Sequence, residues 1–301
     1  MLLITWFIQS LLVCLSVAFF TLFERKVIAL FMLRLGPNKP GVLGVFTPLL
    51  DALKLFTKQN IIPFQSNKIT YSAAPHVALM LSILVWVSLP FVFFSFSVNY
   101  SLLFFFCLRS FLVFPVLISG WASNSKYSLI GRLRSVAQSI SYESVFRTLV
   151  VLFLMVSCSF CVSSYYVSSS FILLVLILPW VLCTLAETHR APFDFRESES
   201  ELVSGFNTEY GGAYFSFVFL AEYSMLLFSC CLIPCIFLSF LLPIRVESFS
   251  LLGLTIRFIF IWIRVTFCRF RYDRLIRVSW KILLPASLNL FALFLSLLYF
   301  V

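Results

Sequence analysis

The sequence predicts an all-α polytopic membrane protein with about eight transmembrane helices and one short interfacial amphipathic helix, in a single integral membrane domain over residues 1–301. Its composition is 61% hydrophobic with a mean hydropathy of +1.05, whereas soluble domains are about 45–50% apolar. Its charge-free runs, such as residues 1–23 and 148–186, reach the roughly 20 residues that a transmembrane helix needs. The predicted spans cover residues 2–30, 70–95, 101–121, 136–161, 170–187, 212–241, 249–267 and 281–301.

The first span, residues 2–30, carries no charged side chain before Glu24, Arg25 and Lys26. Another apolar turn follows these three residues, so they do not simply lie beyond the membrane. One interpretation is a cluster that extends its charged ends to the membrane interface. The other is that these residues belong to a functional site.

Residues 43–58 form the predicted interfacial helix. Their apolar side chains recur at helical spacing, and Asp51 and Lys54 occupy the opposite face. A segment of this length is too short to cross a bilayer, and an amphipathic helix of this kind lies along the membrane surface. Asp51 and Lys54 are interpreted either as a solvated face or as part of a site.

The fourth span, predicted at residues 136–161, follows a polar link over residues 122–135 and opens with Glu143 and Arg147. These two residues are four apart on one helical face, with the acid before the base, which is the favourable order. An ionisable residue inside a span is costly, so it suggests a function. The alternative is an ion pair that only stabilises packing.

The later spans also contain charges. Glu222 lies inside the sixth span, with no base within a turn of it in the sequence. Arg257 and Arg264 lie seven residues apart in the seventh span and therefore on one face. A basic link over residues 269–281 precedes the last span.

The loop between the fifth and sixth spans, residues 188–211, is the most acidic part of the chain. With its flanking residues it reads ETHRAPFDFRESESELVSGFNTEYGG, and between Glu187 and Glu209 six acids oppose two bases. Such a run is ordinarily a solvated face. Because this one lies between long charge-free spans, it indicates part of a functional site.

The distribution of basic residues predicts the orientation. Most of the 22 Lys and Arg residues lie on the links that follow odd-numbered spans. By the positive-inside rule these links face the cytoplasm, or the matrix in a mitochondrion. The acidic loop and the basic link over residues 269–281 would therefore share one face of the membrane.

Neither metal nor redox cofactor sites are predicted in this chain. Of nine cysteines, Cys158 and Cys161 and the group Cys230, Cys231 and Cys235 lie inside apolar runs, where a cluster would have no polar second shell. We interpret them as small buried hydrophobic residues. The sequence also contains no phosphate-binding loop, dinucleotide fingerprint or nucleic-acid module, so redox cofactors must belong to partners.

Four segments carry a family resemblance. They are ERKVIALFMLRLGPNKPG at 24–41, GWASNSKYSLIGRLRSVAQSISYE at 120–143, AETHRAPFDFRESESELVSGFNTEYGG at 186–212 and FCRFRYDRLI at 267–276. In this order they closely resemble the mitochondrially encoded membrane subunits that complete the quinone site of respiratory complex I, the proton-pumping NADH:ubiquinone oxidoreductase. The resemblance implies an inner mitochondrial membrane protein with ubiquinone as its substrate. It also implies flavin mononucleotide and iron–sulfur clusters in partner subunits.

The resemblance also implies roles for individual residues and for partners. The ubiquinone channel would be formed by Glu24, Arg25, Arg34, Asp51, Arg190, Glu197, Glu199, Glu201, Phe219 and Arg274. The proton path would contain Glu143, Glu187, Glu209 and Glu222. Acids close together cannot all ionise, so a change of charge at one end shifts protonation along the row. Partners would be the soluble quinone-module subunits, the proton-pumping membrane subunits and membrane lipids, with cardiolipin as a candidate.

Three positions depart from the family pattern: His189 stands where Asn is common, Arg132 replaces a small residue and Cys268 replaces a proline. His189 is interpreted either as a neutral substitute for Asn or as a group that titrates near neutral pH.

Other functions considered are a proton-coupled secondary transporter, the related subunit of a membrane-bound hydrogenase or non-NADH quinone reductase, and a structural anchor. An anchor would not explain the intramembrane acids Glu143 and Glu222.

Overall fold

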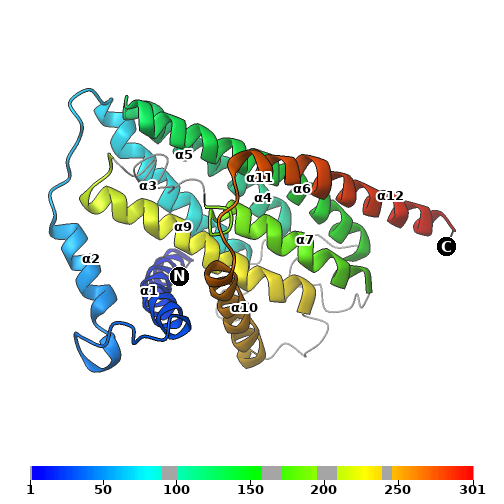
Figure 1. Cartoon of the computed structure of the whole chain (residues 1–301), viewed down its shortest axis with the longest axis horizontal. Helices are drawn as coiled ribbons and strands as arrows, with labels where there is room; N and C mark the ends of the chain where they lie inside the picture. The colour runs from blue at the N-terminus through cyan, green and yellow to red at the C-terminus, as the bar shows by residue number, and fades with distance from the viewer. Residues whose placement is uncertain (1, 90–99, 158–170, 195–208, 239–245, 301) are drawn as a thin grey trace.

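The computed structural model describes residues 2–89, 100–157, 171–194, 209–238 and 246–300 (Figure 1). In this part of the chain every regular element is helical, which confirms the all-α prediction. The α-helices are α1 (Leu2–Phe31), α2 (Thr47–Thr57), α3 (Lys68–Val85), α4 (Ser101–Phe111), α5 (Val113–Ala122), α6 (Lys126–Ser157), α7 (Phe171–Glu187), α9 (Gly212–Ile233), α10 (Val246–Thr266), α11 (Tyr272–Val278) and α12 (Leu284–Phe300). Short 3-10 turns occupy Val42–Gly44 and Trp86–Ser88, and π-helical turns occupy Pro234–Leu238 and Ser279–Leu283.

Five helical segments within the described residues are long and apolar enough to cross a membrane: Trp6–Phe31, Lys68–Ser88, Ser101–Ala122, Gly212–Phe237 and Tyr272–Ser296. A shorter apolar helix covers Val175–Glu187. The fourth and seventh predicted spans correspond to α6 and α10. The chain therefore has the architecture of a polytopic membrane protein, as predicted.

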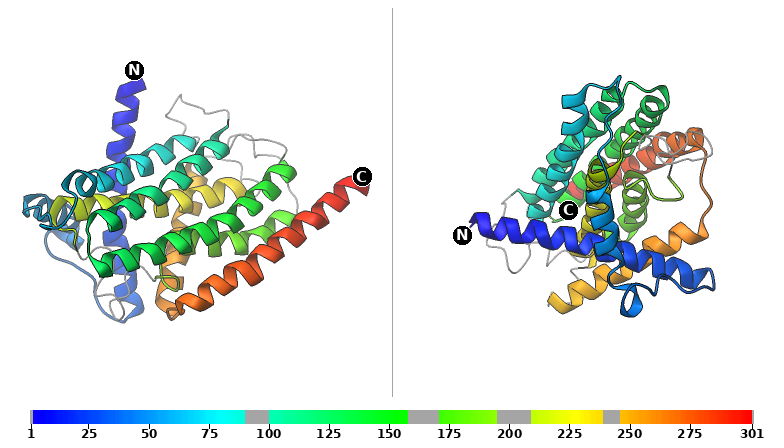
Figure 2. Two further views of the ribbon diagram at one scale, coloured as in Figure 1. Left: turned by 90° about the horizontal axis from the view of Figure 1, so that it is seen from above. Right: turned by 90° about the vertical axis from the view of Figure 1, so that its left-hand side faces the viewer.

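Most of the long helices run side by side, whereas α1 crosses them. Helix α3 packs between α9 and α5, and α6 packs between α5, α7 and α12. Helix α1 contacts α9, α10 and α2, and the left view of Figure 2 shows it lying across the direction of the other long helices. This crossing carries residues near the end of α1 against the middle of α9.

Two segments that were predicted as links between spans are helical. Helix α6 begins at Lys126 rather than at residue 136, since polar side chains in this stretch find partners inside the protein. Arg132 is 3% exposed, and its guanidinium donates to the Val116 carbonyl at 2.9 Å. The last helical segment begins at Tyr272 rather than at residue 281, with Asp273 in the first turn of α11, where the helix dipole favours an acid.

The predicted interfacial helix is present as α2, within residues 43–58 but shorter. The chain before it turns sharply at Gly44, which has φ +69°. A Cβ at Gly44 would lie 2.3 Å from the Pro37 carbonyl oxygen, so this turn requires glycine. The turn places α2 against α1 and α9.

The core lies between α4, α6, α7 and α9, and is rich in aromatic residues. Phe146 and Trp180 are almost fully buried, with their ring centroids 4.4 Å apart. The predicted burial of Cys230, Cys231 and Cys235 is confirmed, whereas Cys158 and Cys161 lie outside the described residues. Charged side chains inside this apolar bundle must therefore find partners within the protein.

Candidate functional site

Glu24 of α1 is the centre of a buried polar cluster. It is 5% exposed, and Oε1 accepts hydrogen bonds from Arg190 at 3.3 Å and from Arg264 of α10. The Tyr223 hydroxyl of α9 donates to Oε2 at 2.9 Å. We call these four residues the Glu24 cluster. The interpretation of Glu24 as an interfacial, snorkelling residue is therefore wrong, because α9 and α10 cover this part of α1.

Arg190 connects the acidic loop to the Glu24 cluster. It lies just beyond the end of α7, and its guanidinium stands 4.1 Å from the Tyr223 ring centroid. Burial by itself lowers the pKa of Arg190, but Glu24, Tyr223 and Glu222 outweigh this effect, so the pKa lies above its ordinary value. The guanidinium therefore stays charged. Phe219 lies one turn earlier on α9, 4.3 Å from the Tyr223 ring.

The end of α7 directs successive residues to different sides. The His189 N–H bonds to the Ala186 carbonyl and the Arg190 N–H bonds to the Leu185 carbonyl, and His189 has φ +50°. This is the Schellman pattern, with His189 at the left-handed position after the helix. Gln138 of α6, fully buried, donates to the carbonyls of Ala186 and Phe193 at 2.7 and 2.9 Å. The start of the loop is thereby fixed to α6.

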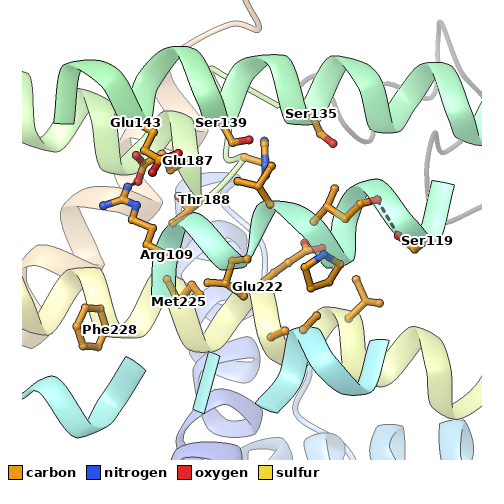
Figure 3. A pocket seen from close by; sticks show the side chains of 18 of the residues that line it. Arg109, Ser119, Ser135, Ser139, Glu143, Glu187, Thr188, Glu222, Met225 and Phe228 are labelled. Atoms are coloured by element: carbon orange, nitrogen blue, oxygen red, sulfur yellow. Dashed lines mark hydrogen bonds and ion pairs between the residues drawn. The ribbon is translucent and has the colours of Figure 1, made fainter. Parts of the chain in front are cut away.

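A cavity of about 150 Å³ lies beside this helix end. Figure 3 shows Glu143 of α6, Glu187 of α7 and Glu222 of α9 around it. His189 and Arg109 of α4 also line it. About half of its lining residues are polar or charged. We call it the acid cavity.

Arg109 and Arg147 hold two of the acids of this cavity. Arg109 forms an ion pair with Glu187, and the side chains of both are 11% exposed. Arg109 also stacks 3.9 Å from the Phe146 ring centroid. Glu143 pairs with Arg147, as the spacing predicts, and accepts a hydrogen bond from Ser110 at 2.5 Å. Glu143 is therefore a paired acid that also faces the cavity.

The other end of the acidic loop is fixed by tyrosines. Glu209 does not line the acid cavity, and its backbone carbonyl accepts a hydrogen bond from the Tyr71 hydroxyl. The rings of Tyr71 and Tyr210 stack with centroids 4.3 Å apart, and the Tyr210 hydroxyl donates to the Tyr71 carbonyl at 3.1 Å. Burial raises the pKa of Tyr210 to about 12, against the lowering influence of Arg132. Tyr210 therefore stays neutral and hydrogen-bonded at physiological pH.

The remaining predicted site residues lie outside both clusters or outside the described residues. Arg25 pairs with Asp51 of α2 at 2.9 Å, and both side chains are about half exposed. Arg34 is exposed in the loop after α1. Arg274 is exposed on α11, 5.6 Å from the Phe270 ring centroid. Glu197, Glu199 and Glu201 lie outside the described residues, and among the residues that are described no group of His, Cys, Asp and Glu could hold a metal ion.

Several residues that complete these sites were not predicted. Arg264 and Arg109 were visible as bases within spans, but sequence spacing could not show which acids they pair with. Gln138 and Tyr223 carry no distinctive signal, because a polar residue within an apolar helix does not reveal its partner. Arg132, noted only as a departure, lines the acid cavity and lies 5.6 Å from the Tyr210 ring centroid.

The chain is similar to known proteins over nearly its whole length. The family model described as NADH dehydrogenase matches residues 4–295. Relatives named NADH-ubiquinone oxidoreductase chain 1 include one from Anopheles gambiae, 43% identical over 295 residues, which cover 95% of this chain and 92% of the relative. One from Aedes aegypti is 42% identical, with 96% and 93% covered. One from Lemur catta is 39% identical, with 99% and 96% covered.

Proposed function

The chain belongs to the NADH dehydrogenase family, since the family model matches residues 4–295, and from that premise we propose that it forms the ubiquinone passage of a proton-pumping NADH–ubiquinone oxidoreductase. It is a membrane subunit of that enzyme, and its own part is to receive the quinone and to couple quinone reduction to proton movement. This family membership argues against the alternative of a secondary transporter.

The Glu24 cluster is suited to the inner end of the passage. A quinone headgroup needs polar hydrogen-bonding groups, while its isoprenoid tail needs an apolar path. Glu24 and Arg190 provide buried charges, and Phe219 and Tyr223 provide aromatic surface next to them. The exposed pair of Arg25 and Asp51 belongs to the mouth of the passage in this proposal, with α2 beside it. Arg34 and Arg274 are exposed, and we assign them, with Glu197, Glu199 and Glu201, to this passage on the family likeness alone.

The acid cavity is suited to proton transfer. Three acids from three different helices face one space, with Arg109 next to Glu187. In this proposal a change in charge on one of these carboxylates shifts the protonation of the rest, as happens between acids that lie close together. Glu209 is placed in this path only by family likeness, because its side chain does not line the cavity.

The observation that carries the proposal is that the Glu24 cluster and the acid cavity share their walls. On α9, Glu222 lines the cavity while its neighbour Tyr223 bonds to Glu24. Beyond α7, His189 lines the cavity while its neighbour Arg190 bonds to Glu24. A change of charge at the Glu24 cluster therefore alters the electrostatic potential in the acid cavity, because two pairs of adjacent residues connect the two sites.

The partners and location follow from the same proposal. The enzyme's other subunits would supply the flavin and iron–sulfur clusters, and ubiquinone is the substrate. The protein would lie in the inner mitochondrial membrane with the links after odd-numbered spans facing the matrix. Its net charge of +10 favours anionic lipid headgroups such as those of cardiolipin.

The proposal is tested by photolabelling the assembled enzyme with a reactive quinone analogue while NADH-dependent ubiquinone reduction is followed. Label is expected within residues 24–51 or 190–219, and added ubiquinone should compete it away. Label confined to partner chains during normal reduction would contradict the passage and leave only the proton path.

A further inference from the structure

His189 occupies a backbone position that most side chains avoid. It follows the last turn of α7 with φ +50°, in the left-handed region that Gly adopts most readily and that Asn, Asp and His tolerate better than other residues. The Schellman bonds of His189 and Arg190 fix this turn. The backbone at His189 is thus fixed by the end of a helix, and the residue lines the acid cavity.

We propose that His189 is a proton-transferring residue of the acid cavity, which moves protons between the Glu187 side of the cavity and Glu222. This inference rests on the proposed function and adds a residue to it. Among the residues that line the cavity, His189 is the one whose ordinary pKa, about 6.5, lies near physiological pH. Carboxylates and guanidiniums ordinarily titrate far from that range.

The charged residues that line the acid cavity together with His189 come from four helices. They are Glu187 on α7, Glu143 and Arg132 on α6, Arg109 on α4 and Glu222 on α9, with Arg190 and Glu24 on the other side of the helix end. Arg147 reaches Glu143 from the more exposed side of α6.

The acid cavity can also hold water. A buried water molecule needs about 10–15 Å³ of cavity volume and polar partners. The acid cavity has a volume of about 150 Å³. One ring nitrogen of His189 accepts a proton from a carboxylic acid, which becomes a carboxylate, and the other ring nitrogen then releases a proton to a second carboxylate. The imidazole ends neutral in its other tautomer, and one proton has crossed the cavity.

The test compares His189→Asn with His76→Asn in the assembled enzyme. Asn tolerates the left-handed backbone and forms hydrogen bonds, but it cannot carry a proton near neutral pH. His76 is the chain's other histidine, exposed on α3 and outside the cavity lining. NADH oxidation by an artificial hydrophilic acceptor reports on intact assembly, while ubiquinone reduction and proton uptake are measured from pH 5.5 to 9.

We expect His189→Asn to keep the artificial-acceptor rate and to lose about tenfold in coupled ubiquinone reduction. This loss is below the roughly 10²–10⁴-fold that a positioned proton-transfer group contributes, because the carboxylates of the cavity remain. The rate of ubiquinone reduction in His189→Asn should no longer change with pH near pH 6.5. The His76→Asn variant should keep that change. A pH profile that keeps its shape in His189→Asn, whatever the reaction rate, would overturn the inference, because His189 would then have only a structural role. His189→Gly, which suits the backbone best, serves the same comparison if the Asn variant fails to assemble. If Glu222→Gln leaves proton uptake intact, the proposed proton path itself fails, which is a separate result.

Discussion

Replacing Arg109 by Gln tests whether the acid cavity depends on a buried ion pair. The side chains of Arg109 and Glu187 are each 11% exposed, so water cannot solvate a carboxylate whose partner is removed. Breaking a buried pair in this way costs about 3–5 kcal/mol. Loss of the stacking on Phe146 adds about 0.5–2 kcal/mol.

The double substitution Arg109→Gln with Glu187→Gln separates these contributions. It leaves two neutral amides that can bond to each other, so no buried charge remains. We therefore expect the double variant to be more stable than either single variant, with an interaction of about 2–3 kcal/mol in the cycle. Arg25→Gln is the matched control, because its side chain and that of its partner Asp51 are 56% and 51% exposed and an exposed pair contributes only about 0.2–1 kcal/mol.

The free energies are measured from unfolding of the purified subunit by SDS in mixed micelles. Fluorescence of Trp180 is a local reporter, because its ring centroid lies 4.4 Å from that of Phe146, on which Arg109 stacks. Substituting the remaining tryptophans by Phe isolates that signal. Additive single and double effects, or an Arg25→Gln cost equal to that of Arg109→Gln, would refute the reasoning.

Three further changes probe the ends of the acidic loop and the Glu24 cluster. Glu24→Gln should lower NADH–ubiquinone reduction at least tenfold, because it leaves two nearby guanidiniums without their acid, while the rate with an artificial hydrophilic acceptor stays unchanged. Tyr210→Phe should cost about 1 kcal/mol through the lost hydrogen bond. Because the pKa of Tyr210 is raised to about 12, the stability that its neutral form provides is complete below pH 10 and is lost between pH 10 and 12. The Tyr210→Phe variant should therefore lose less stability over that alkaline range than the unsubstituted protein. Gly212→Ala should be more destabilising than Gly211→Ala in the same unfolding assay, since a Cβ at Gly212 would lie 2.4 Å from Asn60 at φ +61° whereas one at Gly211 has no neighbour within 4 Å.

Hydropathy was sufficient to predict the helical architecture, because the bilayer requires long apolar helices and the runs of the sequence supply them. It did not predict the helices over residues 126–135 and 272–280, where polarity suggested links between spans. In both places the helix continues, because Arg132 is buried against α5 and Asp273 favours a helix start. Polarity indicates contact with water only when no partner inside the protein is available.

The pairing of charges could be predicted only where both members share one helix. Glu143 and Arg147 met this condition, and their pair is confirmed. Glu24 and Arg264 are separated by 240 residues, and their contact depends on the angle at which α1 crosses α9 and α10. No local sequence pattern determines that angle. Three predicted acids do share one cavity, but their roles in proton transfer stay predictions.

The shared walls make a particular mode of coupling available. Glu222 and Tyr223 point about 100° apart on α9, as successive helical residues must, and the left-handed turn at His189 separates the directions of His189 and Arg190 in the same way. A charge placed near Glu24 therefore acts on the acid cavity across one layer of side chains, and no helix has to move. If coupling used this electrostatic route, variants that keep charge but change size, such as Arg190→Lys, would weaken quinone reduction while keeping the number of protons moved per electron. A route that depends on helix movement would instead lower both together.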